Sequence, residues 1–304
     1  MKKPSIHNNF FSDLFSDERN VRDFLSAKLP VDVRDNLNLS KIVIDSENYT
    51  EADGHEHRMD LLIHTETKNN SPADVYILFE HKSSPDNYVS VQLLRYMAAL
   101  WRQDSKNNQP LRLIIPLVFY HGKNRWRVPD SFHSMFDCEE SFRRFIPSFT
   151  YHLFDTAEHD LTPGKNPKLR KNVELLSSLL AVKSVMKNDI EGLRAMLRFW
   201  QENNFLSNTK KSFFILQYAG RVMDVEKKQF GNIIEEELRE GGDIMPTVAE
   251  QWMNEARQQG ARTKAIETCK KLLRMGMDPS VVSDATGLPI EKVFDIQKSL
   301  KKSK

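Results

Sequence analysis

This sequence is poor in cysteine and in long apolar runs, and each shortage excludes a class of protein. Its two cysteines, Cys138 and Cys269, are too few for a disulfide framework and form no CxxC metal pair. No window approaches the run of about 18 apolar residues that a membrane span needs, and the first residues contain no apolar signal-peptide core. We therefore expect a soluble, cytoplasmic protein with no membrane partner.

Excess charge of either sign is lacking as well. Lys and Arg total 44 against 42 Asp and Glu, which gives a formal net charge of +2. The sequence pI near 8.4 falls short of the strongly basic footprint of a protein that coats nucleic acid. Any contacts with phosphate must therefore be local. The hydrophobic content of 39%, with 18 Phe in 304 residues, indicates a folded chain with a sizeable core.

The first half of the chain alternates between helical and strand patterns. Apolar spacing predicts a helix from Phe10 to Leu29, where Pro30 ends it, and Ser16-Asp17 is a candidate break. Ser84-Pro85-Asp86 has the composition of a helix start. Strands are expected at residues 41–49, 57–67, 75–82, 111–122 and 149–155. This order predicts an α/β fold with a mixed central sheet flanked by helices.

The second half is predicted to be all-helical. Amphipathic windows follow one another from about residue 167 to 223, and a long charged helix is expected from about residue 246. Two short helices broken at Thr286-Gly287-Leu288-Pro289 complete the chain. The predicted organisation is a core at 1–155, a helical extension at 156–245, and a long helix with a small helix-turn-helix-like tail at 246–304.

One strand ends in charges that need an explanation. The stretch VYILFEHK, residues 75–82, runs from five apolar residues into Glu80 and Lys82, which share a face because strand side chains alternate. Asp60 lies in the preceding strand. If the two strands pair, Asp60 and Glu80 converge at one end of the sheet. Two carboxylates with water and phosphate oxygens are the ligands that Mg²⁺ prefers, and a nearby lysine can assist an attacking water.

These residues carry a resemblance. A strand Asp60 followed by Glu80-x-Lys82 is similar to the PD-(D/E)xK nuclease signature, and Gln92 with Tyr96 resembles the QxxxY element of its RecB-like branch. The stretches HRMDLLIH, ILFEHKSSPD, VQLLRYM, IIPLVFYHGKNRW and LLRMGMDPSVVSDATGLPIEKV together resemble the Rpn (YhgA-like) recombination-promoting nuclease family. The similarity covers the first 155 residues well and the last unit moderately.

The resemblance implies a restriction-endonuclease-like core and a metal-dependent DNA endonuclease linked to recombination or transposition. Asp60 and Glu80 would bind Mg²⁺, or Mn²⁺ or another divalent cation, with the His81 backbone carbonyl as a third ligand. Lys82 would assist the water nucleophile that attacks phosphorus. Gln92 and Tyr96, one helical turn apart, would support the site and contact DNA.

The start of the chain departs from the family pattern. Family members often begin with His-Asp and carry a lysine after the following Phe, where this chain has His7-Asn8 and Ser12. A contribution to the site from the first helix is therefore in doubt. The substitutes in this region are Asp13, Glu18 and Asp23.

Other readings of these features stay open. The Asp60, Glu80 and Lys82 set is also compatible with a structural ion pair, and the protein with an inactive DNA-binding or scaffolding role on the same fold. An RNA-directed nuclease would use the same site. The last helices are expected to mediate assembly into a homo-oligomer or to contact DNA weakly.

Further candidate groups are less specific. His55, Glu56 and His57 lack a further ligand at matching spacing, which favours a soluble loop. Four basic residues are interleaved with aromatic residues: Arg125, Arg127, Arg143 and Arg144. They are compatible with phosphate binding and equally with an ordinary solvated surface. No Gly-rich phosphate loop is present, and Ser83 lacks the context of a nucleophile elbow.

Overall fold

The computed structural model describes residues 6–45, 60–80, 85–238, 265–275 and 277–302. Within the chain, residues Met1–Gly241 and Gly242–Lys304 form two compact units. The predicted core at 1–155 lies in the first unit, and so does the predicted helical extension at 156–245 up to Gly241. None of the described helices combines the length and apolar content that crossing a lipid bilayer requires.

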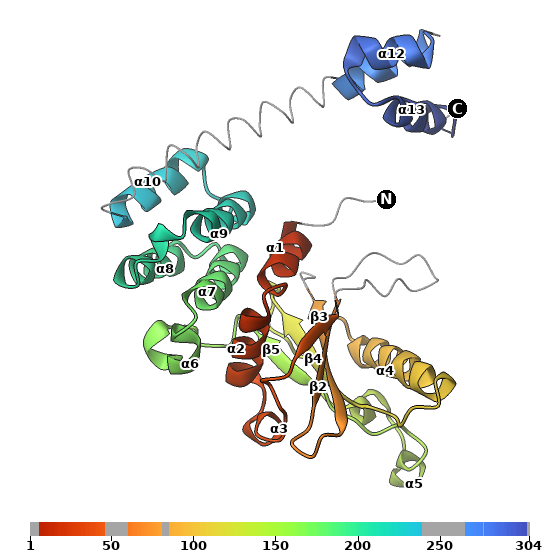
Figure 1. The fold of residues 1–304 in the computed structure, drawn as a ribbon, viewed down its shortest axis with the longest axis vertical. Helices are drawn as coiled ribbons and strands as arrows, with labels where there is room; N and C mark the ends of the chain where they lie inside the picture. Colours follow the sequence, from red (N-terminus) through yellow and green to blue (C-terminus); the bar gives the residue numbers. More distant parts are fainter. Residues whose placement is uncertain (1–5, 46–59, 81–84, 239–264, 276, 303–304) are drawn as a thin grey trace. The chain divides into compact units, whose positions relative to one another are not determined.

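A five-stranded mixed sheet forms the centre of the first unit (Figure 1), and its strand order is β1-β2-β3-β4-β5. The first three strands are antiparallel neighbours, whereas β4 runs parallel to β3 and β5 runs parallel to β4. The strands are β1 Val43–Asp45, β2 Asp60–Glu66, β3 Pro72–Glu80, β4 Leu113–Tyr120 and β5 His152–Asp155. The sequence predicted this mixed sheet.

Two helices with a short break between them form the start of the chain, as the sequence predicted. Helix α1 covers Ile6–Leu14 and α2 covers Glu18–Lys28. The Asp17 carboxylate caps α2 by accepting a hydrogen bond from the backbone N–H of Arg19 at 2.9 Å. Leu29 already has an extended backbone, because the residue before Pro30 avoids helical angles. A short helix, α3 Val31–Arg34, follows.

The helix that follows β3 begins later than the sequence predicted. Helix α4 covers Val89–Lys106, and Pro85 and Asp86 precede it. Asp86 instead makes a turn, in which its carboxylate accepts a hydrogen bond from the Tyr88 N–H at 2.9 Å and its carbonyl accepts one from the Val89 N–H. The local preference of aspartate for such turns replaces the expected cap at Ser84-Pro85.

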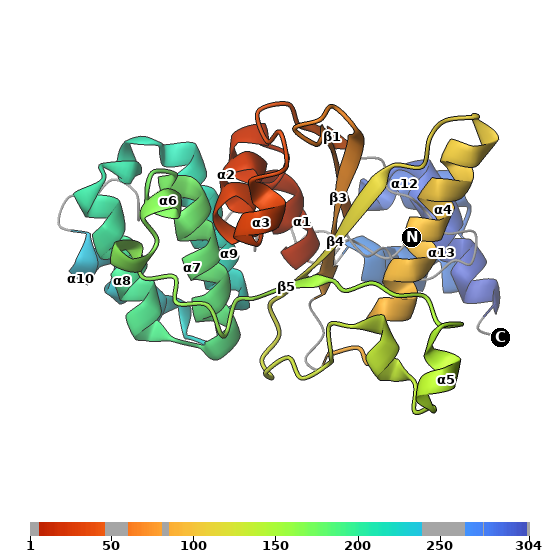
Figure 2. The ribbon, with the colours of Figure 1, turned by 90° about the horizontal axis from the view of Figure 1, so that it is seen from below.

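Helices cover both faces of the sheet (Figure 2), with α1, α2 and α3 on one side and α4 on the other. We call the second side the α4 face. Leu62, Tyr76, Leu78, Val118 and Tyr120 belong to a buried cluster there, together with Val89, Leu93, Met97 and Leu100 of α4. Since strand residues alternate between faces, the residues between them point to the other helices. That opposite face is aromatic, with Phe79, Phe119 and Phe154 packed against Phe11, Phe15 and Phe24.

The rest of the first unit is helical. Two 3₁₀ turns and a short α5, Glu140–Arg143, flank β5. The helices that follow are α6 Pro167–Arg170, α7 Val173–Lys187, α8 Ile190–Glu202, α9 Thr209–Val222 and α10 Lys227–Glu237. Helix α9 packs on α1, where the Phe10 and Tyr218 rings stack with centroids 3.9 Å apart. These stacked rings join the helical bundle to the helices that cover the sheet.

The second unit has a small core of its own. Helical residues 265–274 pack with α12 Pro279–Thr286 and α13 Ile290–Lys302 around Cys269, Val282 and Val293. Gly287 ends α12 with φ of +65°, a left-handed conformation that glycine adopts without strain. The predicted break at Thr286-Gly287-Leu288-Pro289 is confirmed.

Candidate active site

The strand register relates Asp60 and Glu80 to each other. Asp60 pairs with Leu78 in the antiparallel β2–β3 ladder, and Glu80 lies two residues beyond Leu78 in the same strand. Directly opposed residues share a face, as do residues two apart, so both positions lie on the α4 face. The Cα atoms of diagonal neighbours on adjacent strands are about 7–8 Å apart. The two carboxylate-bearing positions are thus neighbours at the end of β3.

Helix α4 lies over these positions and carries the next two candidates. Val89, Leu93 and Met97 form its buried stripe, and Gln92 and Tyr96 are half-buried beside that stripe. The Tyr96 ring stacks on the Tyr76 ring, with centroids 3.6 Å apart and an interplanar angle of 14°. Tyr76 is on the same face as Leu78. The structure therefore brings Gln92 and Tyr96 to the face that contains positions 60 and 80.

Several predicted residues lie outside the described part of the chain. These include Lys82, the proposed helper of the nucleophile, and His81, whose carbonyl was the predicted third metal ligand. Ser83 and the trio His55, Glu56 and His57 also lie outside it. Among the side chains that the structure describes, no group of three or more His, Cys, Asp or Glu is arranged to hold a metal ion. The metal site at Asp60 and Glu80 stays a prediction.

The acidic residues of the first two helices have surroundings of their own. Asp13 is exposed, and Glu18 pairs with Arg22 on the surface of α2. The Asp23 carboxylate accepts a hydrogen bond from the Asn172 side chain at 2.8 Å and lies 3.8 Å from Arg19. Because α1 and α2 cover the opposite face of the sheet, this geometry offers no support for adding these carboxylates to the site.

A buried histidine near the same end of the sheet was not predicted from the sequence. His121 directly follows β4 and is 1% exposed, and its ring lies 5.3 Å from that of His7. The Nδ1 atom of His7 is 2.9 Å from the Tyr218 hydroxyl. Burial raises the pKa of Tyr218 well above its ordinary value, so the phenol stays neutral. A lone histidine after a strand gives no periodic signal, which is why His121 was not singled out.

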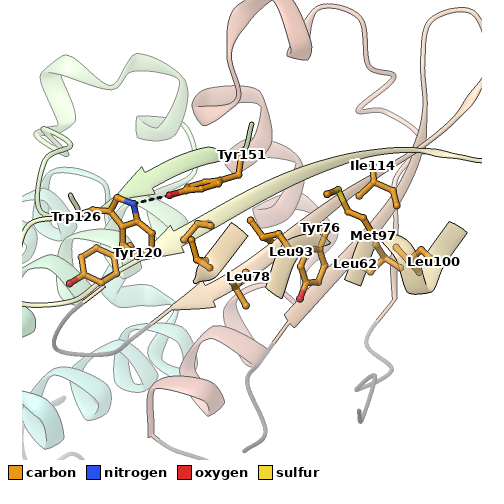
Figure 3. Packing of buried hydrophobic residues seen from close by; sticks show 12 residues of the cluster. Leu62, Tyr76, Leu78, Leu93, Met97, Leu100, Ile114, Tyr120, Trp126 and Tyr151 are labelled. Carbon is orange, nitrogen blue, oxygen red and sulfur yellow. Dashed lines mark hydrogen bonds between the residues drawn. The ribbon is translucent and has the colours of Figure 1, made fainter. Parts of the chain in front are cut away.

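The segment after β4 is fixed by Trp126, which is 7% exposed. Its indole Nε1 donates to the Tyr151 hydroxyl and to the Val128 carbonyl, each at 3.0 Å. Its backbone N–H donates to the buried Asp155 carboxylate at 3.3 Å. Figure 3 shows Trp126 and Tyr120 at one end of the α4-face cluster and Leu100 at the other. Trp126 is thus held against the α4 face, just beyond the carboxyl end of β4.

The opposite end of the same face carries a buried ionic network. His64 pairs with Asp74 in the register, and its Nδ1 lies 2.9 Å from an Asp74 carboxylate oxygen. Arg112 donates to Asp74 through Nη1 at 3.0 Å and binds the Asp104 carboxylate through Nε and Nη2. The hydrogen bond to Asp74 raises the pKa of His64, and the bond to Arg112 lowers that of Asp104. With two carboxylates engaged by one arginine, the network serves to hold β2, β3, α4 and β4 together.

Comparisons with known proteins agree with the resemblance seen in the sequence. The family described as "Putative transposase, YhgA-like" matches residues 5–212. The recombination-promoting nuclease RpnC of Escherichia coli (strain K12) is 24% identical over 96% of this chain and 98% of its own length. RpnA of the same strain is 23% identical over 94% of this chain and 95% of its own.

A third relative bears a different label. The protein named inactive recombination-promoting nuclease-like protein RpnE, also from E. coli K12, is 24% identical over 93% of this chain and 95% of its own length. No solved structure matches the chain. Since the family match spans the sheet, the candidate site and the first helices of the bundle, this chain belongs to the YhgA-like transposase family.

Proposed function

We propose that this protein is a metal-dependent endonuclease that hydrolyses phosphodiester bonds in DNA and acts in recombination or transposition. The observation that carries the proposal is the register, in which Asp60 and Glu80 are diagonal neighbours on the α4 face. The names of RpnC and RpnA support nuclease activity and a part in recombination. We further propose that the sheet and its helices form a restriction-endonuclease-like core.

The donor set suits a hard divalent cation. Asp60 and Glu80 offer carboxylate oxygens from neighbouring strands, and Mg²⁺ binds oxygen ligands while it keeps several waters. In the proposal the His81 carbonyl adds a third oxygen. When bound, the cation would stabilise negative charge on the scissile phosphate and favour ionisation of the attacking water.

The remaining residues act on the substrate directly. Lys82 orients the water or neutralises negative charge on the phosphate, because its ammonium is positively charged whereas the two carboxylates are negative. Gln92 donates and accepts hydrogen bonds through its amide, and Tyr96 does so through its hydroxyl. The stack on Tyr76 fixes the tyrosine ring, so its hydroxyl is presented from a rigid support.

A nicking assay on supercoiled DNA with Mg²⁺ tests the proposal. Wild-type protein is expected to nick, and Asp60→Asn and Lys82→Ala are expected to lose on the order of a hundredfold or more in rate, as for a lost electrostatic contact in other active sites. Asp32→Asn is the matched control, because Asp32 is an exposed carboxylate on α3. Equal rates in all four proteins would exclude the assigned site. Chelation with EDTA should abolish nicking, and Mn²⁺ should restore it.

Metal binding gives a readout that does not depend on turnover. Calorimetric titration with Mn²⁺ is expected to detect binding by the wild type that Asp60→Asn weakens and Asp32→Asn does not. Unchanged binding in Asp60→Asn would remove this residue from the metal site.

One relative favours a second candidate function. The name of RpnE includes the word inactive, and a non-cleaving DNA-binding or scaffolding protein on this fold is the alternative. Binding of DNA by the wild type with no nicking in either Mg²⁺ or Mn²⁺ would favour it. Parallel digestion of RNA distinguishes an RNA-directed nuclease, for which RNA alone would be cut.

A further inference from the structure

The loop at residues 121–128 lies next to the proposed catalytic positions. In the parallel β3–β4 ladder Glu80 pairs with Tyr120, and the loop begins at the following residue. Tyr120 and Trp126 belong to the cluster on the α4 face, and their rings are 4.9 Å apart (Figure 3). The loop therefore starts beside Glu80 and is anchored on the same face as positions 60 and 80.

The exposed side chains of this loop are basic. Lys123, Arg125 and Arg127 are all exposed, and residues 121–129 contain no Asp or Glu. Arg125 is partly neutralised by Glu158, at 3.2 Å. Within the part of the chain that the structure describes, neither Lys123 nor Arg127 has an ion-pair partner. Two positive charges next to the candidate site are thus available to an anionic ligand.

The backbone that carries these charges is held in place. The Tyr120 hydroxyl donates to the Asn124 carbonyl at 2.7 Å, and Trp126 is buried between the exposed Arg125 and Arg127. The Asp155 carboxylate also accepts from the Ala157 N–H at 2.8 Å, so the group that holds the Trp126 N–H is itself fixed. An anchored loop presents its cations at little cost in ordering, unlike cations on a mobile tail.

The geometry points to a phosphate-binding loop. We propose that Lys123 and Arg127 bind backbone phosphates of DNA that flank the cleaved bond, with Arg125 in a smaller role because Glu158 competes for it. This inference rests on DNA as the proposed substrate but not on turnover. The small net charge of the whole chain fits a local contact with phosphate. Contacts from a rigid basic loop beside positions 60 and 80 would set where the protein sits on the duplex, but they would not read the base sequence.

Salt-dependent binding tests the proposal directly. Fluorescence anisotropy of a duplex DNA probe is measured with full-length protein in EDTA, so that the probe is not cut. The double variant Lys123→Ala/Arg127→Ala is expected to lose affinity by on the order of tenfold for each contact near 0.1 M salt, and its slope of log K against log salt should become shallower by about 0.9 for each contact. The single variant Arg125→Ala should change both quantities less.

The matched control is Lys68→Ala/Lys106→Ala. It removes the same charge from two exposed lysines, Lys68 just after the far end of β2 and Lys106 as the last residue of α4, and should leave the slope near that of the wild type. Equal slopes in the two double variants, or no binding by the wild type, would overturn the proposal. If the loop variant loses affinity only for an RNA duplex and not for the DNA duplex, the assignment to DNA would be overturned. If the wild type never nicks DNA but the loop variant still loses affinity for it, the phosphate-binding role of the loop stands and the proposed cleavage activity is refuted.

Discussion

The Tyr76 ring in β3 stacks on the Tyr96 ring in α4 with centroids 3.6 Å apart, and this pair joins the sheet to the helix that carries the QxxxY element. Tyr76 is 1% exposed, so its ring is fixed by the core. Tyr96 is half-buried and depends on that support. The stack links a core residue that the sequence did not single out to a predicted site residue.

A double-mutant cycle measures this stack. We expect Tyr76→Leu and Tyr96→Leu to be coupled by about 0.5–1.5 kcal/mol in the free energy of unfolding, because each change removes the same ring pair. Tyr96→Phe should retain the stack and stability yet lower the nicking rate, since only the hydroxyl is removed. Urea denaturation gives the coupling, and additive effects of the two leucines would contradict it.

Arg112 is expected to be the most sensitive position of the ionic network. Arg112→Met leaves Asp74 and Asp104 buried without their cation, and loss of one partner of a buried ion pair costs about 3–5 kcal/mol. Arg102→Met, an exposed position on α4, should stay within about 0.5 kcal/mol of the wild type. Thermal or urea unfolding measures both. A loss of the same size in the two variants would contradict the role assigned to Arg112.

His64 should make stability depend on pH. The hydrogen bond to Asp74 raises its folded-state pKa above the ordinary value of 6.5, so the folded protein holds the proton more tightly than the unfolded chain does. This contribution is fully present below pH 6.5 and is lost as pH rises through the raised folded pKa. Compared with His64→Gln, the wild type should therefore lose its advantage in unfolding free energy as the pH rises from 6.5 through the raised folded-state pKa.

The control for this pH effect is His133→Gln. The His133 ring faces the Ile146 carbonyl at 3.2 Å and not a carboxylate. A difference between wild type and His64→Gln that stays constant over the whole pH range would contradict the linkage to His64.

The second unit is expected to associate with another copy of this chain. Ile290 and Phe294 are 38% and 46% exposed and lie one turn apart on α13, whereas Val293 and Ile296 fill the core of the unit. We propose that this exposed apolar pair forms a homo-oligomer contact. Phe294→Glu should shift the protein to monomer in light scattering, and Glu291→Lys on the same helix should not. A monomeric wild type would refute the proposal.

Local signals in the sequence predicted much of the fold. The break before Glu18 follows from the Asp17 cap, and the end of α2 follows from Pro30, so both depend on neighbours in the chain. The start of α4 was predicted wrongly for an equally local reason. Asp86 has two uses, as an early helix residue or in a turn, and composition alone does not choose between them.

Contacts between residues that are far apart in the sequence could not be predicted from the sequence alone. Alternation along a strand already places Glu80 on the face of Tyr76, but only the register shows that position 60 is its diagonal neighbour. The network of Asp74 and Arg112 joins residues 38 positions apart, and no periodic pattern marks such a pair. The anchoring of Trp126 by Tyr151 is hidden for the same reason, although the basic residues around it were noticed.

The location of the ionic network has an evolutionary consequence. His64 and Asp74 lie four residues along their strands from Asp60 and Leu78, about 13 Å away, so the sheet is fastened at the end remote from the proposed chemistry. A descendant that lost its acidic pair would keep this fastening and remain folded. A protein family built on such a scaffold can therefore include stably folded members without nuclease activity, and the name of RpnE calls that protein inactive.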